Sequence, residues 1–298
     1  MKIRTPLGIL LAASLAMTGC SNNDQTTGAS TDAGEVTTLR FSHFMTATDN
    51  INTEALEPWA KKIEADSNGR LKIEIYPSAT LSKPGATYDA TAKGSVDIGM
   101  QAQGYTAGRF PLTQIVELPG ITNTAQQQSC ILHKLYNDGI IKDEYEDTHL
   151  LALIGTGQGA LHTVDKPIRT PADMKGLRIR QPSAVASHII EATGAAPVGM
   201  PASDTYTSLQ RGVIDGLSFT WQPIQAFRLD ELINAKAMAA AKEKGDIMID
   251  IPDPLNDPDW RGPLMEGSQH YLDEVNATGL DADNVYEKAK AASSGCMV

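Results

Sequence analysis

The sequence has few basic residues, few aromatic residues and little cysteine. Its 25 Lys and Arg face 36 Asp and Glu, a net charge of −11, and this argues against nucleic-acid binding, which needs a basic face to neutralise phosphates. Three cysteines are too few for a fold held together by a disulfide framework. What remains is ordinary: 41% hydrophobic residues in 298 are typical of a globular protein with one large domain or two of about 100–150 residues.

The only long apolar stretch lies at the N-terminus. Lys2 and Arg4 precede the apolar segment 7–17, a pattern typical of a secretory signal that ends at residue 19. The tetrapeptide Met17-Thr18-Gly19-Cys20 resembles a bacterial lipobox and predicts that Cys20 is lipidated. The alternative is an ordinary signal peptide that is cleaved nearby, with Cys20 incidental.

Residues 20–37 are small, polar and without periodicity, so they are too poor in apolar surface to order themselves. We expect a lipid-anchored flexible linker here, with the mature protein periplasmic or on the cell surface. In such a compartment Cys130 and Cys296 can pair, but we expect a buried free Cys130 and an exposed Cys296. The sequence alone does not decide this point.

Strand and helix patterns alternate along the rest of the chain, which predicts two α/β domains with mixed, mostly parallel sheets. Ligands of such folds bind beyond the carboxyl ends of the strands or in the cleft between domains. The first domain is expected over residues 38–160, with strands at 38–44, 71–76, 96–100 and 149–154. The second is expected over residues 161–228, with strands at 176–180, 196–200 and 213–216 and with helices capped by Ser183 and Ser203.

The sequence gives no support for catalysis. Residues 155–160 fit the dinucleotide-binding pattern G-x-G-x-x-A, but the β-branched residues and Pro167 that follow cannot start the helix that a pyrophosphate requires. A Rossmann-like, nucleotide-dependent enzyme therefore stays only as an alternative. The six histidines show no metal-ligand spacing, and we predict no metal, no cofactor and no catalytic residue.

The segment 171–180 is the most informative one. Arg178 and Arg180 are two residues apart on a predicted strand, so their side chains point to the same face. A face that is normally apolar needs a reason to hold two arginines. We interpret Arg178 as an exposed strand end. Arg180 lies at the carboxyl end of the strand, where its guanidinium fork matches a carboxylate.

With these residues the chain resembles the solute-binding proteins of TRAP transporters, the C4-dicarboxylate-binding periplasmic protein family. The resemblance covers residues 38 to about 233 in the order of the family. It rests on FSHF (41–44), GRLKIEIYP (69–77), GSVDIG (94–99), YTAGRFP (105–111), PADMKGLRIR (171–180), GAAP (194–197) and GVIDG (212–216).

The resemblance implies a periplasmic-binding-protein-like clamshell of two domains that closes on one ligand. The main carboxylate-binding arginine of the family falls on Arg180, and a second arginine found in some members is absent here, near Ala160 or Leu161. Polar and aromatic contacts of the ligand fall around residues 219–222, and first-domain contacts fall near Asn50 and on the loop 101–105. The candidate ligand-binding residues are Arg180, Trp221, Phe219, Gln222, Tyr105, Gln103, Asn50, His43 and His162.

The expected function is capture of an organic acid by a lipid-anchored monomer, which delivers the acid to the membrane subunits of a TRAP permease. The aromatic wall favours an acid less polar than a sugar acid. One departure stands out: after Leu232 several dozen residues of the family pattern are missing, so that residues 229–298 resemble a truncated hinge helix and a C-terminal helical tail. Two further alternatives follow, a receptor for another transporter or sensor, and a non-functional, internally deleted binding protein.

Overall fold

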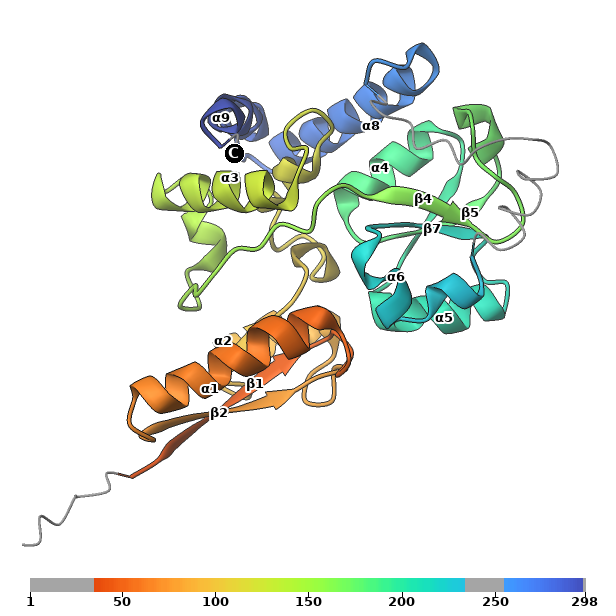
Figure 1. The fold of residues 1–298 in the computed structure, drawn as a ribbon. Helices are drawn as coiled ribbons and strands as arrows, with labels where there is room; N and C mark the ends of the chain where they lie inside the picture. The colour runs from red at the N-terminus through yellow and green to blue at the C-terminus, as the bar shows by residue number, and fades with distance from the viewer. Residues whose placement is uncertain (1–34, 234–254, 297–298) are drawn as a thin grey trace, which may run out of the picture. The chain divides into compact units, whose positions relative to one another are not determined.

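The computed structural model describes residues 35–233 and 255–296 of the chain. A parallel sheet with the strand order β2-β1-β3 forms the centre of a first lobe, with α1 packed against β2 and α2 against β3 (Figure 1). The predicted strands at 38–44 and 71–76 are confirmed. The elements of this lobe are β1 (Thr37–His43), α1 (Glu57–Asp66), β2 (Leu71–Tyr76), α2 (Thr87–Ala92) and β3 (Ile98–Met100). The next helix along the chain, α3 (Ala125–Asn137), packs on the C-terminal helix α9.

A second, mixed sheet forms the centre of a second lobe. Its strand order is β4-β7-β5-β6, in which β5 runs parallel to both of its neighbours and β4 runs antiparallel to β7. The predicted fold class of α/β lobes with mostly parallel sheets is confirmed. The elements of this lobe are β4 (Ala160–Thr163), β5 (Arg178–Gln181), α4 (Ala184–Ala192), β6 (Ala196–Gly199), α5 (Ala202–Gln210), β7 (Gly216–Phe219) and α6 (Gln222–Ala226).

The strands predicted at 96–100 and 176–180 begin two residues later than predicted, at Ile98 and Arg178, and two other predicted strands differ more. Residues 149–154 form no strand, because the backbone N–H groups of Leu153, Gly155 and Thr156 are bonded instead by side chains of α3. The strand predicted at 213–216 begins only at Gly216. The three residues before Gly216 form the turn into β7, after a glycine at position 212 with φ of 65°.

The largest hydrophobic core lies where α3, α4 and the two C-terminal helices meet. Figure 1 shows α9 beside α3, and α8 packs along α4. Ile131, Leu135, Tyr271 and Val285 are all buried in this cluster. The C-terminal helices are α8 (Pro258–Ala277) and α9 (Ala282–Gly295).

A disulfide joins Cys130 of α3 to Cys296 at the end of α9, with the two Cα atoms 5.8 Å apart. The prediction that both thiols are free was therefore wrong, and so was the exposed position of Cys296, which is 3% exposed. The packing of α9 on α3 brings together two cysteines 166 residues apart. Within the predicted truncated hinge helix and C-terminal tail at 229–298, residues 234–254 lie outside the described residues.

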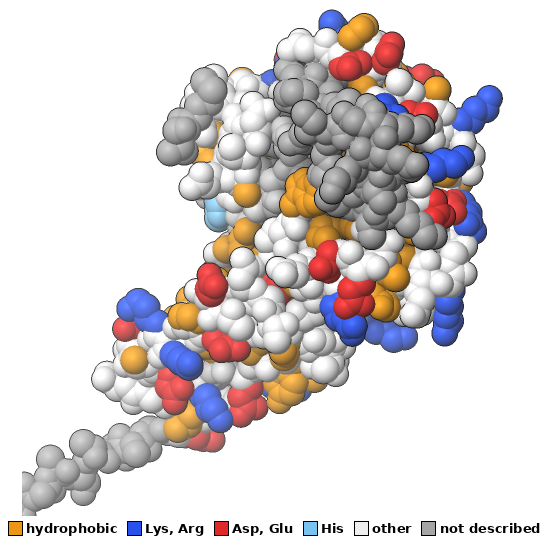
Figure 2. Space-filling view, turned by 45° about the vertical axis from the view of Figure 1, so that its right-hand side comes forward, with side chains coloured by type: hydrophobic (Ala, Val, Ile, Leu, Met, Phe, Trp, Pro, Cys, Tyr) orange, Lys and Arg blue, Asp and Glu red, His pale blue; other side chains and the backbone are white. Residues whose placement is uncertain are grey.

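Acidic and basic side chains are interspersed on the face of the protein drawn in Figure 2. Charged side chains of the described residues form ion pairs, as Arg40 does with Asp97 and Arg178 with Asp215. Within residues 35–233 and 255–296, no helix has both the length and the apolar character that crossing a membrane requires.

Candidate functional site

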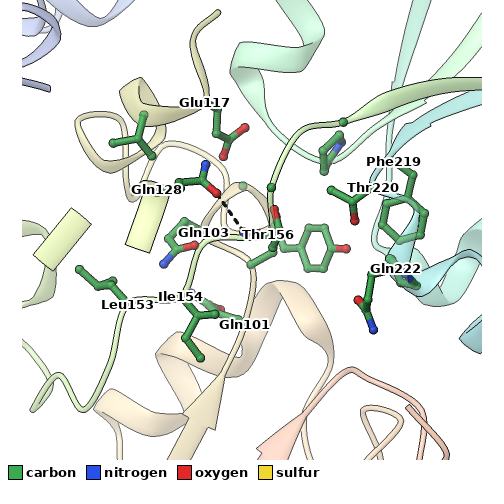
Figure 3. Close-up of a pocket in the computed structure, with 18 of the residues that line it drawn as sticks. Gln101, Gln103, Glu117, Gln128, Leu153, Ile154, Thr156, Phe219, Thr220 and Gln222 are labelled. Carbon is green, nitrogen blue, oxygen red and sulfur yellow. Dashed lines mark hydrogen bonds between the residues drawn. The ribbon is translucent and has the colours of Figure 1, made fainter. Parts of the chain in front are cut away.

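The two lobes line a common cavity of about 1880 Å³, larger than the roughly 300–1000 Å³ of an ordinary small-molecule site. In Figure 3, Phe219, Thr220 and Gln222 of the second lobe lie on the opposite side of the cavity from Leu153 and Ile154. The cavity also extends over one apolar face of the first sheet, where its lining residues include Leu39, Phe41, Leu71 and Ile73.

Arg180 lies directly behind the wall of this cavity. Its side chain is completely buried, 0% exposed, because β5 is an inner strand of the second sheet. The guanidinium donates from Nε to the carbonyl of Met200 (3.0 Å) and from Nη1 to the carbonyl of Ser218 (3.1 Å), and it lies 4.8 Å from the centre of the Phe219 ring. Burial lowers the pKa of Arg180 from its ordinary value.

Tyr105 reaches Arg180 from the first lobe. Its hydroxyl accepts a hydrogen bond from Nη2 of Arg180 (3.1 Å) and another from the backbone N–H of Ala202 (3.1 Å). The approach depends on Gly104, because a Cβ at that position would lie 2.3 Å from the carbonyl oxygen of Pro182. Two predicted ligand-binding residues are thus bonded to one another across the lobes.

Gln222 forms a second polar contact between the lobes. Its side-chain amide donates to Oδ1 of Asn50 at 2.6 Å and lies 3.3 and 3.4 Å from the two carboxylate oxygens of Asp49. Asp49 is itself buried and accepts from the backbone N–H of Ile51. The structure therefore brings together Asn50 and Gln222, which the family resemblance had assigned to separate walls of the cleft.

His162 and Trp221 form one edge of the cavity. Their rings meet edge to face with centres 4.5 Å apart, and Nε2 of His162 lies 3.2 Å from the carbonyl oxygen of Phe219. Burial lowers the pKa of His162, which favours a neutral imidazole. Trp221 is half exposed, at 50%, so its indole is available to a ligand.

Of the remaining predicted ligand-binding residues, one lies at the cavity and one does not. Gln103 lines the cavity, whereas His43 does not. His43 is buried, and its Nε2 lies 2.9 Å from Oδ1 of Asn52, so its contacts are those of a structural residue. Burial lowers the pKa of His43 as well. Cys20 lies outside the described residues.

Glu117 is a cavity residue that the sequence analysis missed. Its carboxylate faces the cavity (Figure 3) and accepts a hydrogen bond from Ser183, the N-cap of α4. Surrounding protein desolvates the carboxylate and raises the pKa of Glu117 to about 7. The available signal was a single acid in the otherwise apolar run 115–118.

The glycine-rich segment 155–159 leads into β4, which begins at Ala160. A dinucleotide-binding turn has a helix N-terminus at this point, and the structure has a strand instead. No group of three or more His, Cys, Asp or Glu side chains suited to a metal ion occurs within the described part of the chain.

The sequence pattern of the bacterial extracellular solute-binding protein family 7, DctP, matches residues 41–247. The chain belongs to this family. The resemblance to TRAP solute-binding proteins is thereby confirmed, and because the family consists of transport binding proteins rather than enzymes, the nucleotide-dependent enzyme loses its support.

Among curated relatives, a solute-binding protein of Albidiferax ferrireducens is 28% identical over 62% of this chain and 54% of its own length. The 2,3-diketo-L-gulonate-binding periplasmic protein YiaO of Escherichia coli is 27% identical over 72% of this chain and 62% of its own length. The chain thus spans between about half and three fifths of the length of these relatives.

Solved structures of the same kind are similar over most of the chain. A marine metagenome TRAP solute-binding protein, crystallised with 3-hydroxybenzoate, has a TM-score of 0.78 at 26% identity, covering 89% of this chain and all of its own. A TRAP solute-binding protein of Rhodoferax ferrireducens with copurified benzoate has a TM-score of 0.71 at 27% identity, covering 88% of this chain and 98% of its own.

Proposed function

We propose that this protein is the solute receptor of a TRAP-type transporter and that it binds a small aromatic acid. The observation that carries the proposal is the buried guanidinium of Arg180, stacked on Phe219 at the wall of a cavity that both lobes line. A guanidinium held by carbonyl groups on one side is preorganised to take a carboxylate on the other. The carboxylate of the ligand pairs with Arg180.

The proposed aromatic body of the ligand rests on the side chains around the guanidinium. Tyr105, Phe219 and Trp221 present three rings to the cavity, and aromatic rings prefer edge-to-face or offset contacts with one another. Two of the similar structures contain benzoate or 3-hydroxybenzoate. A sugar acid needs several hydrogen-bonding groups to pair with its hydroxyls. The wall beside Arg180 is made mainly of aromatic side chains, which suit the ring of an aromatic acid better.

In the proposed mechanism the acid contacts both lobes, so that only the closed arrangement gains the full binding free energy. Gln222 and Asn50 already make one such cross-lobe contact. The closed, loaded receptor then delivers the acid to the membrane subunits of the permease, as a monomer held near the membrane.

The test is native mass spectrometry of the freshly purified protein, followed by calorimetry with benzoate and 3-hydroxybenzoate. We expect a copurified small acid and a one-to-one titration, with gulonate and succinate binding at least tenfold more weakly. Preferential binding of a sugar acid would overturn the aromatic assignment. Absence of binding to every acid by a cooperatively folded protein would overturn the receptor itself.

The membrane anchor is a separate part of the proposal. It rests on the lipobox-like Met17-Thr18-Gly19-Cys20 and the polar linker that follows. Cells expressing the wild-type chain should incorporate radiolabelled palmitate into it, and the variant Cys20→Ser should be unlabelled. Equal recovery of both proteins in the detergent-free soluble fraction would contradict the anchor.

The size of the cavity favours a second candidate, the non-functional, internally deleted binding protein. A cavity of about 1880 Å³ that leaves the apolar face around Leu39 and Ile73 only partly buried is what a missing element of the first lobe would leave. Chemical denaturation distinguishes the two candidates. A functional receptor should unfold in one cooperative transition whose midpoint moves to a higher denaturant concentration when benzoate is present. A non-functional, internally deleted protein should show a broad transition whose midpoint no acid changes.

A further inference from the structure

Two hydrogen-bond donors of the second lobe converge on one oxygen atom, the hydroxyl of Tyr105. One donor is Nη2 of Arg180 and the other is the backbone N–H of Ala202, each 3.1 Å away. Ala202 is the first residue of α5, a helix of nine residues. A guanidinium and an N–H at a helix N-terminus are both typical partners of an anion, yet the oxygen they hold here is the hydroxyl of a tyrosine.

The position of Tyr105 makes it the obstacle between the cavity and Arg180. Tyr105 and Phe219 line the cavity, whereas Arg180 does not. Two of the three guanidinium nitrogens already donate to Met200 and Ser218, so Nη2, the nitrogen bonded to Tyr105, is the one turned toward the first lobe. A carboxylate that enters from the cavity must take the place of the phenol oxygen to reach Nη2.

Packing on both lobes holds the phenol in this place. Its ring meets Phe44 edge to face with centres 5.2 Å apart, and Gly104 allows the backbone of this loop to lie against Pro182 and Ser183. The hydroxyl of Tyr105 therefore occupies the position between Nη2 of Arg180 and the N–H of Ala202 where an anion would bind, and it also links the two lobes.

We propose that the hydroxyl of Tyr105 holds the carboxylate position of this receptor and that an acid binds by displacing it. This inference rests on the proposed function and deepens it, because it makes Tyr105 a specificity-determining residue. A carboxylate forms stronger hydrogen bonds with a guanidinium than a phenol does, so an acid can displace the hydroxyl. A neutral ligand of the same shape offers no stronger acceptor and stays excluded.

Because the hydroxyl and the carboxylate compete for one position, the apparent association constant equals the intrinsic one multiplied by the fraction of molecules in which Tyr105 has left that position. Removing the hydroxyl in Tyr105→Phe leaves both donors directed at an empty position and keeps the ring. We expect benzoate to bind about tenfold to a hundredfold more tightly, the range of one hydrogen bond to a charged group, and to associate faster. Neutral benzamide should gain little.

The experiment compares wild type, Tyr105→Phe and the control Tyr206→Phe by calorimetry with benzoate and benzamide. Tyr206 lies on α5 of the second lobe and does not line the cavity, and its hydroxyl bonds Glu231, so loss of this hydroxyl should change neither affinity. Unchanged or weaker benzoate binding by Tyr105→Phe would overturn the inference, and so would an equal gain for benzamide. If wild type binds no aromatic acid although it unfolds cooperatively, the proposed function falls as well.

Kinetics of the wild type alone provide a second route, which does not depend on the variant folding. Tryptophan fluorescence should follow benzoate binding, because Trp59, Trp221 and Trp260 all line the cavity. Displacement of the hydroxyl requires the observed association rate to reach a plateau as the benzoate concentration rises, because release of Tyr105 becomes limiting. A rate that stays linear up to the mixing limit would contradict displacement.

Discussion

Arg178 and Arg180 lie two residues apart on β5, yet Arg178 pairs with Asp215 at the surface while Arg180 is completely buried against Phe219. The ion pair of Arg178 joins Nη2 to Oδ1 of Asp215 at 2.7 Å. Exposed pairs of this kind contribute roughly 0–1 kcal/mol. The two arginines therefore form a matched pair of positions, one structural and one at the candidate site.

Arg180→Lys should abolish most of the binding of an aromatic acid. An ammonium group lacks the planar fork that matches a carboxylate, and loss of one charge-assisted contact of about 1.5–3 kcal/mol weakens binding tenfold to more than a hundredfold. Calorimetry with benzoate measures the change, and Arg178→Lys on the same strand should bind like wild type. Equal affinities of the two variants would remove Arg180 from the ligand site.

The position of Arg180 at the end of a strand could be predicted from the sequence because it depends on two local patterns, the alternation of residues along the strand and the helix cap that follows it. Strand periodicity placed the residue at a carboxyl strand end, and the predicted cap Ser183 is the N-cap of α4, whereas the other predicted cap, Ser203, lies inside α5. The contact with Tyr105 was not predictable. It joins residues 75 apart and depends on the close approach at Gly104, which a residue pattern does not encode.

The strand predicted at 149–154 shows the limit of apolar patterns. A run of hydrophobic residues indicates burial but not a strand. Here the backbone N–H groups donate hydrogen bonds to side chains of α3, including His133 and Ser129, rather than to a neighbouring strand. The disulfide was missed for a similar reason. Nothing local to Cys130 or Cys296 reveals that α3 and α9 pack together.

Removal of the disulfide should destabilise the protein without affecting its ligand site. A crosslink between residues 166 apart restricts a long loop of the unfolded chain, and native disulfides of this kind contribute about 2–4 kcal/mol. Urea unfolding of the double variant Cys130→Ser, Cys296→Ser should show this loss, and dithiothreitol should lower the wild type to the same stability. A variant as stable as the oxidised wild type would show that the disulfide does not contribute to the free energy of unfolding.

Gln222→Ala should weaken ligand binding modestly by removing a contact between the lobes. The amide of Gln222 donates to Asn50 at 2.6 Å and lies near the buried carboxylate of Asp49. One such hydrogen bond contributes about 0.5–1.5 kcal/mol, so we expect about a twofold to tenfold loss of benzoate affinity, mainly through faster dissociation.

The control for that prediction is Gln225→Ala, three residues along α6 and exposed. It removes an amide of the same size from the same helix. Stopped-flow dissociation rates that match between Gln222→Ala and wild type would show that the cross-lobe contact does not hold the lobes together on the ligand.

Glu117 should make the stability of the protein fall as the pH rises from about 4.5 to about 7. Desolvation raises the pKa of Glu117 from 4.5 to about 7 in the folded protein. In this interval the folded chain keeps a proton that the unfolded chain has lost, so each rise in pH favours the unfolded state. Below about 4.5 the contribution is fully present, and above about 7 it is gone.

Urea unfolding of wild type and Glu117→Gln between pH 4 and pH 8 isolates this contribution. Glutamine keeps an acceptor for the hydroxyl of Ser183 and does not titrate, and the lowered pKa values of His43 and His162 affect both proteins alike. The free energy of unfolding of wild type minus that of the variant should therefore decrease through the interval and level off above it. Glu266→Gln, an exposed position of α8, controls for the loss of one charge. A difference that is flat across the whole range would mean that the cavity leaves the Glu117 carboxylate as well solvated as water does.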